Sequence, residues 1–480
     1  MAKLINVSFR LPYKLTVTKS RLSVTPSVGG LATALRSYFE LASHGEFDSL
    51  HWVGISDISR TVFERASTLH LVEKDNVVMH PVFLPTQAKE RFYDGFCNSI
   101  IWPLFQYFPS FVIYKQEFFD EYVRANELLA AQIQEIFEPG DTVWVHDYHW
   151  MLLPELVRGR IESAKIGFFL HIPFPSFELF RMLPKAWGER IARGLAGADV
   201  IGFQTADFAS YYVDSLRRIL PGITFQDDVL TVNGRSSVVK EFPISIDFEK
   251  YHAIAASRQI RSAVTKIRHR LTAHKLILSV DRLDYTKAIF SRLESFELFL
   301  EKNPDMREKV SYLLLLVPSR ETILKYKENK QNVDALISRI NGLYGTIGWT
   351  PIVYMYKSVD QKRLVSLYAA ADIALVVPAR DGMNLVAKEY VASRPDGDGV
   401  LILSDTAGAA EELREAVLVN SNDRQEIADS IREGLKMPKA EQRRRMARMQ
   451  EHVREHGVLA WATEFLESVD QMSGLIKTTT

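Results

Sequence analysis

The run 380–390 (RDGMNLVAKEY) contains the residue types best suited to chemistry in this chain. It follows an apolar, strand-like segment and opens a predicted helix over 385–392. Free N–H groups in a first helical turn, together with the helix dipole, bind anions such as phosphate. Asp381 lies just before this helix and Glu389 lies one turn inside it, so both carboxylates can bind sugar hydroxyls. Such a run suits a nucleotide sugar, although an ordinary strand-to-helix loop with a capping Asp is the alternative.

A second charged run, 281–287 (DRLDYTK), follows the predicted strand 276–280. Arg282 offers a planar fork of donors and Lys287 offers a point charge, so together they can contact a diphosphate. Negative charge develops on a diphosphate as it leaves, and each preorganised donor stabilises it by roughly a few kcal/mol. A solvated charged loop is the alternative interpretation.

Histidine and aspartate follow two further predicted strands. Asp147 lies in the motif 146–149 (HDYH), and His171 follows the strand 166–170. Because parallel strands end at one edge of a sheet, we expect Asp147 and His171 to lie on the same rim. Histidine can bind a sugar hydroxyl and aspartate can orient an acceptor hydroxyl. Zinc would need three or four convergent ligands, so no metal site is predicted here. Histidines of the core are the alternative, and it is stronger for His146 and His149 than for His171.

Several residues could form a second anion site. Gly29 and Gly30 precede a predicted helix from about residue 31, where glycine lets the backbone approach a phosphate. Arg10 and Arg320 each lie just past a predicted strand and could hold a phosphate. Tyr93 and Trp102 lie in an aromatic-rich patch that is equally well explained as core.

The elements that position these residues alternate between strand and helix patterns along nearly the whole chain. Apolar strands separated by helices indicate parallel sheets covered on both faces. At 480 residues the chain exceeds one core, and the alternation restarts after Pro243. We therefore predict an α/β protein with two Rossmann-like, doubly wound domains, 1–245 and 246–455, facing each other across a cleft. A C-terminal helix over 456–480 is expected to pack back on the first domain, with one buried face formed by Leu459, Trp461, Ala462, Phe465, Leu466 and Val469.

The composition excludes some classes of partner. The chain has 59 basic and 59 acidic residues, so it has no general attraction to nucleic acid or anionic membranes. Cys97 is the single cysteine, which excludes an intramolecular disulfide and suits a reducing compartment. No segment reaches the ~20 apolar residues that span a bilayer, and no secretory signal pattern is present. We expect a cytoplasmic protein without nucleic-acid or membrane partners, and homo-oligomerisation is left open.

An ordered series of motifs resembles the trehalose-6-phosphate synthase family of retaining glycosyltransferases over nearly the whole chain. The matching motifs are 29–31 (GGL), 102–105 (WPLF), 146–149 (HDYH), 167–175 (GFFLHIPFP), 202–205 (GFQT), 282–287 (RLDYTK), 317–320 (VPSR), 348–351 (GWTP), 380–390 (RDGMNLVAKEY) and 407–410 (AGAA).

The resemblance implies a GT-B fold and transfer of glucose from a nucleotide sugar, usually UDP-glucose, to glucose 6-phosphate. It implies retention of configuration by front-face substitution, with no metal, no other cofactor and no carboxylate nucleophile. The implied donor-binding residues are Gly30, His171, Arg282, Lys287, Asp381, Asn384, Leu385, Val386 and Glu389. The implied acceptor-binding residues are Arg10, Tyr93, Trp102, Asp147 and Arg320. The implied catalytic residues are Asp147, His171, Arg282, Lys287 and Asp381.

The sequence also departs from the family pattern. Phe9 stands where the family usually has asparagine, and Ile55 where it usually has tryptophan on the acceptor side. Ser245 and Ala288 each replace a usual glycine. Because the donor half is better preserved, two alternatives remain beside trehalose 6-phosphate synthesis. One is a glucosyltransferase with another phosphorylated acceptor, such as glycerol 3-phosphate. The other is a catalytically weak sugar-phosphate sensor, against which the intact donor residues argue.

Overall fold

The chain divides into two compact units. The computed structural model describes residues 2–18, 21–26, 30–41, 47–68, 77–271, 274–320 and 324–478. Unit 1 comprises Met1–Ile244 with Val458–Thr480, and unit 2 comprises Ser245–Gly457. The chain therefore passes between the units twice, one residue before the predicted first boundary and two residues after the predicted second one.

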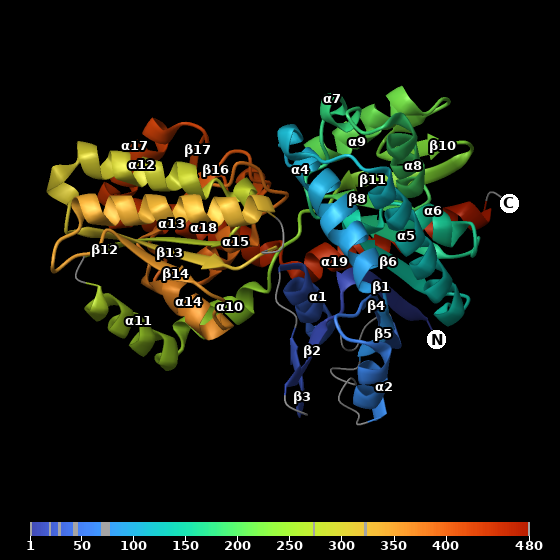
Figure 1. The fold of residues 1–480 in the computed structure, drawn as a ribbon, viewed down its shortest axis with the longest axis horizontal. Helices are drawn as coiled ribbons and strands as arrows, with labels where there is room; N and C mark the ends of the chain where they lie inside the picture. Colours follow the sequence, from blue (N-terminus) through green and yellow to red (C-terminus); the bar gives the residue numbers. More distant parts are fainter. Residues whose placement is uncertain are drawn as a thin grey trace. The chain divides into compact units, whose positions relative to one another are not determined.

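Unit 1 is built on a nine-stranded sheet (Figure 1). Its order is β5-β4-β1-β6-β7-β8-β11-β10-β9. The strands are β1 (Lys3–Arg10), β4 (Ser49–Ile55), β5 (Val77–Val82), β6 (Thr142–His146), β7 (Lys165–Phe169), β8 (Val200–Phe203), β9 (Thr224–Gln226), β10 (Val229–Val232) and β11 (Arg235–Glu241). Strands β5 through β11 in that order pair in parallel, as predicted. They read as apolar runs because both of their faces are covered.

Antiparallel pairs in unit 1 were not predicted. Strand β10 pairs antiparallel with β9 and β11 at one end of the sheet. Strands β2 (Tyr13–Thr18) and β3 (Arg21–Pro26) form a separate antiparallel ladder. Strands β2 and β3 alternate apolar with polar residues, and β9 and β10 are very short, so both ladders give a weaker sequence signal than a buried apolar run.

Helices surround this sheet. They are α1 (Gly30–Leu41), α2 (Arg60–Thr68), α3 (Thr86–Lys89), the π-helix η1 (Glu90–Ile101), α4 (Trp102–Phe105), η2 (Pro109–Phe111), α5 (Gln116–Ile136), η3 (Tyr148–Trp150), α6 (Leu153–Arg158), α7 (Phe177–Phe180), α8 (Lys185–Leu195), α9 (Ala206–Ile219) and α19 (Val458–Thr478). The helix expected from about residue 151 begins at Leu153, because Pro154 in its first turn favours a start there.

Helix α19 packs on β7, β8 and β11 of unit 1 and against α1 (Figure 1). A Cβ added at Gly167 or Gly202 would lie 2.5 or 2.8 Å from the Phe465 ring, so both glycines admit this ring onto the sheet. The prediction that Leu459 belongs to the buried face of this helix was wrong. Leu459 is 42% exposed, whereas its neighbour Val458 is 1% exposed.

Unit 2 contains a six-stranded parallel sheet with the order β14-β13-β12-β15-β16-β17. Its strands are β12 (Lys275–Arg282), β13 (Val310–Val317), β14 (Ile352–Tyr356), β15 (Ile373–Val376), β16 (Val400–Ser404) and β17 (Val417–Val419). Its helices are α10 (Phe248–Ala256), α11 (Arg258–Arg270), η4 (Tyr285–Lys287), α12 (Ile289–Lys302), η5 (Pro304–Met306), α13 (Leu324–Tyr344), α14 (Gln361–Ala370), α15 (Leu385–Ala392), α16 (Ala409–Glu412), α17 (Arg424–Lys436) and α18 (Lys439–Glu455).

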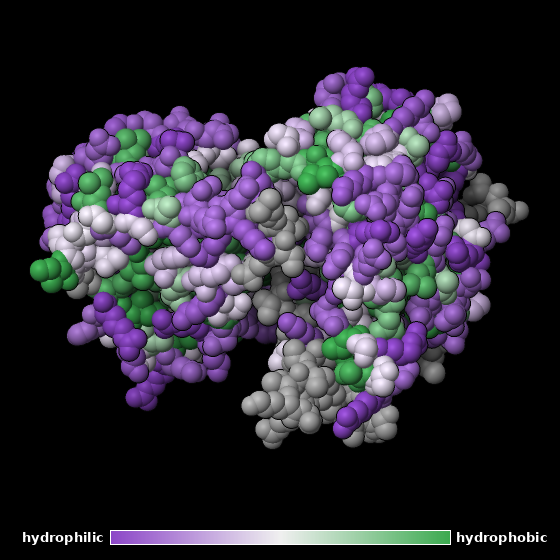
Figure 2. All heavy atoms as spheres, viewed as in Figure 1, coloured by the Kyte–Doolittle hydropathy of each residue, from purple (hydrophilic) through white to green (hydrophobic). Residues whose placement is uncertain are grey.

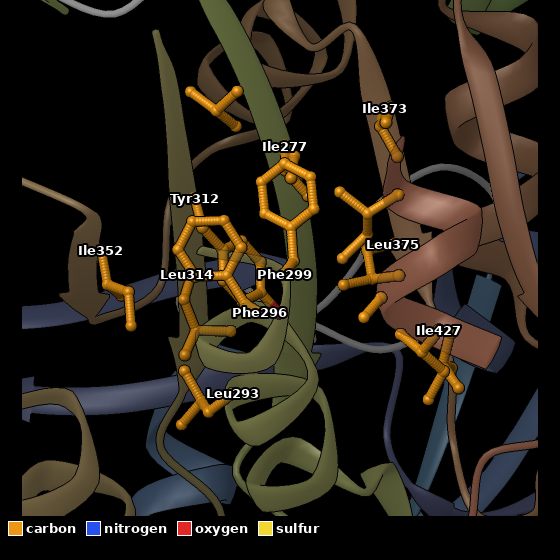
Figure 3. Packing of buried hydrophobic residues seen from close by; sticks show 14 of the residues in the cluster. Ile277, Leu293, Phe296, Phe299, Tyr312, Leu314, Ile352, Ile373, Leu375 and Ile427 are labelled. Carbon is orange, nitrogen blue, oxygen red and sulfur yellow. The ribbon is translucent and has the colours of Figure 1, made fainter. Parts of the chain in front are cut away.

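The core of unit 2 lies between this sheet and its helices (Figure 3). Phe296 and Phe299 of α12 pack with Tyr312 of β13, and Ile427 of α17 lies near Leu375 of β15 (Figure 3). All five side chains are fully buried. Because the core fixes adjacent strands β12 and β15, it also fixes where the loops after them begin.

Ala288 links η4 to α12 in a left-handed conformation, with φ 47° and ψ 37°. This conformation costs an L-residue roughly 1–2 kcal/mol, whereas glycine adopts it freely but loses more entropy on folding. We expect Ala288→Gly to raise the free energy of unfolding of unit 2 by about 0.5–1 kcal/mol in urea titrations. Ala440→Gly, in an exposed helical turn, should lower it instead. Destabilisation by Ala288→Gly would contradict this reading of the family glycine.

The surface is predominantly polar. On the face drawn in Figure 2, both units carry mainly hydrophilic residues, and the hydrophobic ones form small separate groups. Among the described residues, none of the helices combines the length and apolar character needed to cross a bilayer.

Candidate functional site

In unit 2 the predicted donor residues converge beyond the ends of β12 and β15. These strands are neighbours in the sheet, so their loops share one edge. The Lys287 ammonium, in η4, lies 2.5 Å from Oδ2 of Asp381, in the loop before α15. The Asn384 side-chain amide donates to the same oxygen at 2.9 Å. The structure therefore joins three predicted donor residues that lie up to 97 positions apart into one polar chain.

The loop before α15 has the form expected of an anion site. Asn384 caps the helix from a left-handed conformation with φ 84°, and its side-chain oxygen accepts from the Ala387 amide. The amides of Leu385 and Val386 belong to the first turn, which has no partners within the helix. Motif 407–410 supports this loop, because the Gly408 amide donates to the Asp381 carbonyl at 3.2 Å.

Arg282 ends β12 and is exposed, as a ligand for a diphosphate should be. Arg320, predicted on the acceptor phosphate, lies in unit 2 with a buried side chain, 5% exposed. Its guanidinium donates to Asp284 at 3.0 Å and to the Tyr326 hydroxyl at 2.5 Å. Burial raises the pKa of Asp284, but Arg320 and Arg282 outweigh that and leave this pKa below its usual value. Arg320 thus already neutralises a buried acid.

Arg292 of α12 holds the Lys287 loop by hydrogen bonds. Its guanidinium donates to Asp281 at 2.6 Å, to the Leu375 carbonyl at 3.1 Å and to the Lys287 carbonyl at 3.0 Å. The Arg292 side chain is 1% exposed and that of Asp281 is 6% exposed. One buried arginine therefore connects β12, β15 and η4, which is why the position of the Lys287 loop depends on it.

Glu389 lies on α15, between one and two turns after the capping residue Asn384. Both of its carboxylate oxygens accept hydrogen bonds, from the Tyr251 hydroxyl at 2.9 Å and the Tyr368 hydroxyl at 2.8 Å. Burial raises the pKa of Glu389, and the two phenols oppose that rise. Glu389 as a whole residue is half-buried.

In unit 1 the two predicted rim residues lie in one cluster. His171 Nε2 lies 3.1 Å from His146 Nδ1, and the Asp147 amide donates to the Phe169 carbonyl at 2.8 Å. Asp147 has a φ of 75°, a strained conformation for a residue with a side chain. Burial lowers the pKa of His171 to about 3 and that of His146 well below its usual value. Both rings are therefore neutral near pH 7 and can exchange one hydrogen bond.

A second histidine pair lies on β4 and β5, where His51 Nδ1 is 2.8 Å from His80 Nε2. Burial, then His51, lowers the pKa of His80 to about 4. An unfolded chain binds these protons below pH ~6.5, so the pair stabilises unit 1 fully above that pH and progressively less down to about pH 4.

We expect His80→Gln to flatten the loss of unit 1 stability between pH 6.5 and 4, where each such histidine contributes at most about 1.4 kcal/mol per pH unit. Six of the seven tryptophans belong to unit 1, so tryptophan fluorescence during urea unfolding follows it. His456→Gln, at an exposed histidine of unit 2, is the control. An unchanged pH slope in His80→Gln would contradict the assignment.

The aromatic patch predicted near the acceptor is a stack. Phe9 lies face to face with Tyr93, with ring centroids 4.2 Å apart and planes 6° apart. His149 also stacks on Phe9, with ring centroids 4.7 Å apart. Trp102 is 5% exposed and packs on Tyr148. Phe9, a departure from the family pattern, thus contacts a predicted acceptor residue directly.

Arg10 ends β1 and is exposed. It lines a small surface pocket with Lys14, Ile55 and Asp57, among others. A Cβ at Gly54 would lie 3.0 Å from the Ser8 carbonyl and 3.1 Å from the Arg10 backbone, so glycine permits this bulged end of β1. Ile55, where the family usually has tryptophan, is buried at the same place.

The predicted residues are divided between the units. Unit 1 contains Gly30 and His171 of the donor set and Arg10, Tyr93, Trp102 and Asp147 of the acceptor set, whereas unit 2 contains the remainder. Gly30 is the first residue of α1, and Gly29 lies outside the described residues. In the parts of the chain that the structure describes, no group of three or more potential metal ligands occurs.

Sequence reasoning missed the residues that hold the donor loop. Tyr251, Tyr368 and Arg292 belong to helices, and nothing in their local pattern distinguishes them from core residues. Lys388 was also missed, although it stands inside the 380–390 motif. It is fully buried and its ammonium lies 2.6 Å from Glu412, which also contacts His452 at 3.1 Å. The sequence did contain a signal for Lys388. A lysine beside Ala387 and Tyr390 on a buried helix face indicates a buried charge that needs a partner.

This chain is similar to known proteins over nearly its whole length. The model of glycosyltransferase family 20 matches residues 2–471. The bifunctional trehalose-6-phosphate synthase/phosphatase of Thermoproteus tenax is 40% identical over 470 residues, 97% of this chain and 63% of that protein. The chain therefore spans less than two thirds of that relative.

Solved structures of similar length match over the whole fold. The alpha,alpha-trehalose-phosphate synthase (UDP-forming) of Burkholderia xenovorans, in complex with glucose-6-phosphate, has 30% identity and a TM-score of 0.88, covering 98% of this chain and 100% of that one. An E. coli trehalose-6-phosphate protein bound with UDP-2-fluoro glucose has 31% identity and a TM-score of 0.86, covering 98% and 99%. The predicted α/β architecture with two parallel-sheet domains is confirmed, and the chain belongs to glycosyltransferase family 20.

Proposed function

We propose that this chain transfers glucose from UDP-glucose to glucose 6-phosphate, with retention of configuration, and forms trehalose 6-phosphate. The observation that carries the proposal is the chain Lys287–Asp381–Asn384 at the start of α15. It combines a cation, a carboxylate and a helix N-terminus, which suit a diphosphate linked to a sugar. Family membership and the ligands named for the two solved relatives support the same substrates.

In the proposed reaction the bond from the glucose anomeric carbon to the diphosphate breaks, and a bond to the acceptor hydroxyl forms on the same face. Lys287, Arg282 and the amides of Leu385 and Val386 stabilise the negative charge on the leaving diphosphate. Asp381 binds a hydroxyl of the transferred glucose. The leaving phosphate oxygen takes the acceptor proton, so no side chain needs to act as a nucleophile.

Unit 1 is proposed to supply the acceptor side. His171, neutral because burial lowers its pKa to about 3, hydrogen-bonds a hydroxyl of the donor glucose without adding charge. Asp147 orients the acceptor hydroxyl, and Arg10 with Tyr93 holds the acceptor phosphate. Gly30 is proposed to let the backbone approach the donor phosphate. Trp102 of unit 1 and Arg320 of unit 2 complete the proposed acceptor set. A cytoplasmic location remains a prediction.

The test is nucleotide release by the purified protein. UDP-, ADP- and GDP-glucose are each incubated with glucose 6-phosphate and with glycerol 3-phosphate. We expect UDP release with glucose 6-phosphate and a product with the mass of trehalose 6-phosphate. Absence of release with glucose 6-phosphate from every donor would eliminate the proposal. Tight ligand binding without release would indicate the sensor alternative.

One observation favours a second candidate, transfer to a different phosphorylated acceptor. Phe9 covers one face of the Tyr93 ring, and the space beside Arg10 is bordered by Ile55 instead of tryptophan. Both changes make the acceptor side more apolar and less able to hydrogen-bond sugar hydroxyls. Release of nucleotide with glycerol 3-phosphate alone would support this candidate.

We expect Arg10→Gln to raise the KM for glucose 6-phosphate by about tenfold or more, since a charged hydrogen bond to phosphate contributes about 1.5–3 kcal/mol. The KM for UDP-glucose should stay within about twofold. Initial rates at varied acceptor concentration measure both constants. Arg60→Gln, an exposed arginine over Phe83 in the same unit, is the matched control. Equal acceptor KM values in Arg10→Gln and the control would contradict the assignment of Arg10.

A further inference from the structure

Two phenols hold the carboxylate of Glu389, one on each oxygen. Tyr251 of α10 donates to Oε1 at 2.9 Å, and Tyr368 of α14 donates to Oε2 at 2.8 Å. The tyrosines are 5% and 1% exposed, whereas Glu389 is half-buried. Three helices, α10, α14 and α15, thus meet at this carboxylate. A carboxylate needed only for packing could be replaced by an apolar side chain at less cost.

We propose that Tyr251 and Tyr368 are positioning residues that hold Glu389 ionised and oriented to bind two adjacent hydroxyls of the donor ribose. This inference rests on the proposed function, in which Glu389 binds that ribose. An ionised carboxylate has about four acceptor positions, two on each oxygen. Each phenol occupies one position on its oxygen, and one position on each oxygen remains. Two neighbouring acceptor positions match the two hydroxyls of a vicinal diol.

The phenols also favour the ionised form of this carboxylate. Burial raises the pKa of Glu389, and hydrogen bonds from Tyr368 and Tyr251 lower it again. The other neighbours that act on the phenols are Asp247 and Asp281, which are acidic, and Gln361. The hydrogen bonds of the two phenols therefore oppose the protonation of Glu389. Losing either phenol should shift protonation of Glu389 to a higher pH.

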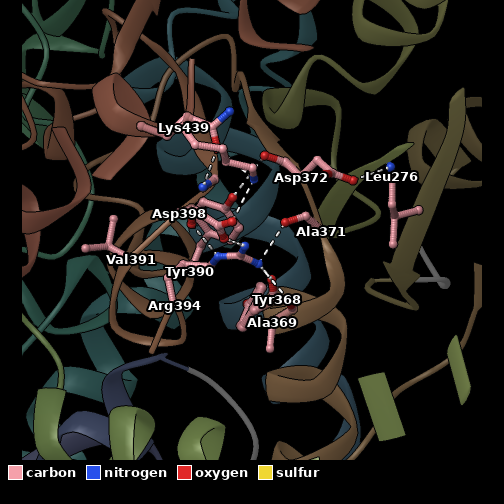
Figure 4. Close-up of polar contacts among 12 residues, drawn as sticks. Leu276, Tyr368, Ala369, Ala371, Asp372, Tyr390, Val391, Arg394, Asp398 and Lys439 are labelled. Atoms are coloured by element: carbon pink, nitrogen blue, oxygen red, sulfur yellow. Dashed lines mark hydrogen bonds and ion pairs between the residues drawn. The ribbon is translucent and has the colours of Figure 1, made fainter. Parts of the chain in front are cut away.

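The backbone around Tyr368 is itself held in place (Figure 4). Arg394 lies just after the end of α15. Its guanidinium donates to the Tyr368 carbonyl at 3.0 Å and to the Ala371 carbonyl at 2.8 Å. Asp398 holds the same guanidinium at 2.6 Å. Tyr251 stands one turn after Asp247, whose side chain caps α10. Because Arg394 joins the end of α14 to the segment after α15, Tyr368 and Glu389 are held in register.

The test measures UDP binding by titration calorimetry for the wild type, Tyr251→Phe, Tyr368→Phe and Glu389→Gln, from pH 5 to 8. Each phenol variant should weaken UDP binding about three- to tenfold at pH 7, the range of one hydrogen bond. Its loss of affinity on acidification should begin at a higher pH than in the wild type. The preference for UDP over its 2′-deoxy analogue should shrink. In turnover assays the KM for UDP-glucose should rise while kcat changes little.

Tyr312→Phe is the matched control, since it also removes a buried phenol of unit 2, one that bonds to Ser279 at 2.8 Å. It should leave UDP affinity and its pH dependence unchanged, even if the protein unfolds more readily. The inference is overturned if the two phenol variants bind UDP as the control does, or if the wild type does not bind UDP. If UDP binding behaves as expected but no glucose is transferred, the proposed function fails and the role of the phenols stands.

Discussion

Lys287→Ala is expected to lower kcat by two to three orders of magnitude, about 2.7–4 kcal/mol for one preorganised donor at a developing charge. The leaving diphosphate loses a cation, and Asp381 loses the ammonium that lies 2.5 Å from it. The freed carboxylate then repels the same diphosphate. Steady-state turnover with UDP-glucose and glucose 6-phosphate measures the effect, and urea unfolding checks that the fold is intact.

The ion pair makes a sharper design possible. Asp381→Asn is combined with Lys287→Ala, because residues in contact should not act additively. If repulsion by Asp381 contributes, the double variant should bind UDP more tightly than Lys287→Ala alone. Lys362→Ala, an exposed lysine of unit 2, is the control for loss of a positive charge. A kcat within tenfold of wild type in Lys287→Ala would refute its role in stabilising the leaving group.

Arg292→Met is expected to destabilise unit 2 by about 3–5 kcal/mol, the usual cost of breaking a buried ion pair from one side. It leaves Asp281 buried, with its pKa raised by burial and no longer opposed by Arg292. It also removes one hydrogen-bond donor from each of the Leu375 and Lys287 carbonyls. Hydrogen exchange of peptides from β12 and β15 reports on unit 2 separately from the tryptophan-rich unit 1.

A second variant separates charge from packing. Asp281→Asn with Arg292→Met removes both charges, and replacing both partners of a buried pair costs less than removing one. The double variant should therefore be more stable than Arg292→Met. Arg292 also donates to the Lys287 carbonyl. We therefore expect kcat to be lower than in the wild type in both the single and the double variant. Equal stability of the single and double variants would mean that the uncompensated Asp281 charge is not the cause.

Local pattern was sufficient for much of the fold. The helix predicted over 385–392 is α15, and the strands predicted over 166–170 and 276–280 lie within one or two residues of β7 and β12. Short antiparallel strands such as β2 and β3 were missed, and Leu459 was placed on the wrong face of α19. These errors share a cause. In short segments of mixed polarity and in the first turn of a helix, tertiary packing decides which side chains are buried, and the local sequence pattern does not.

The sequence by itself determined which chemical groups stand at the strand ends, because parallel strands bring their carboxyl ends to one edge whatever else surrounds them. Tertiary structure alone decided how those groups are paired. The contact between Lys287 and Asp381, the arginine beneath their loop and the two phenols on Glu389 join positions that are 11 to 138 residues apart. Burial, which sets the charge of Glu389 and His171, likewise depends on packing from the rest of each unit and has no local signature in the chain.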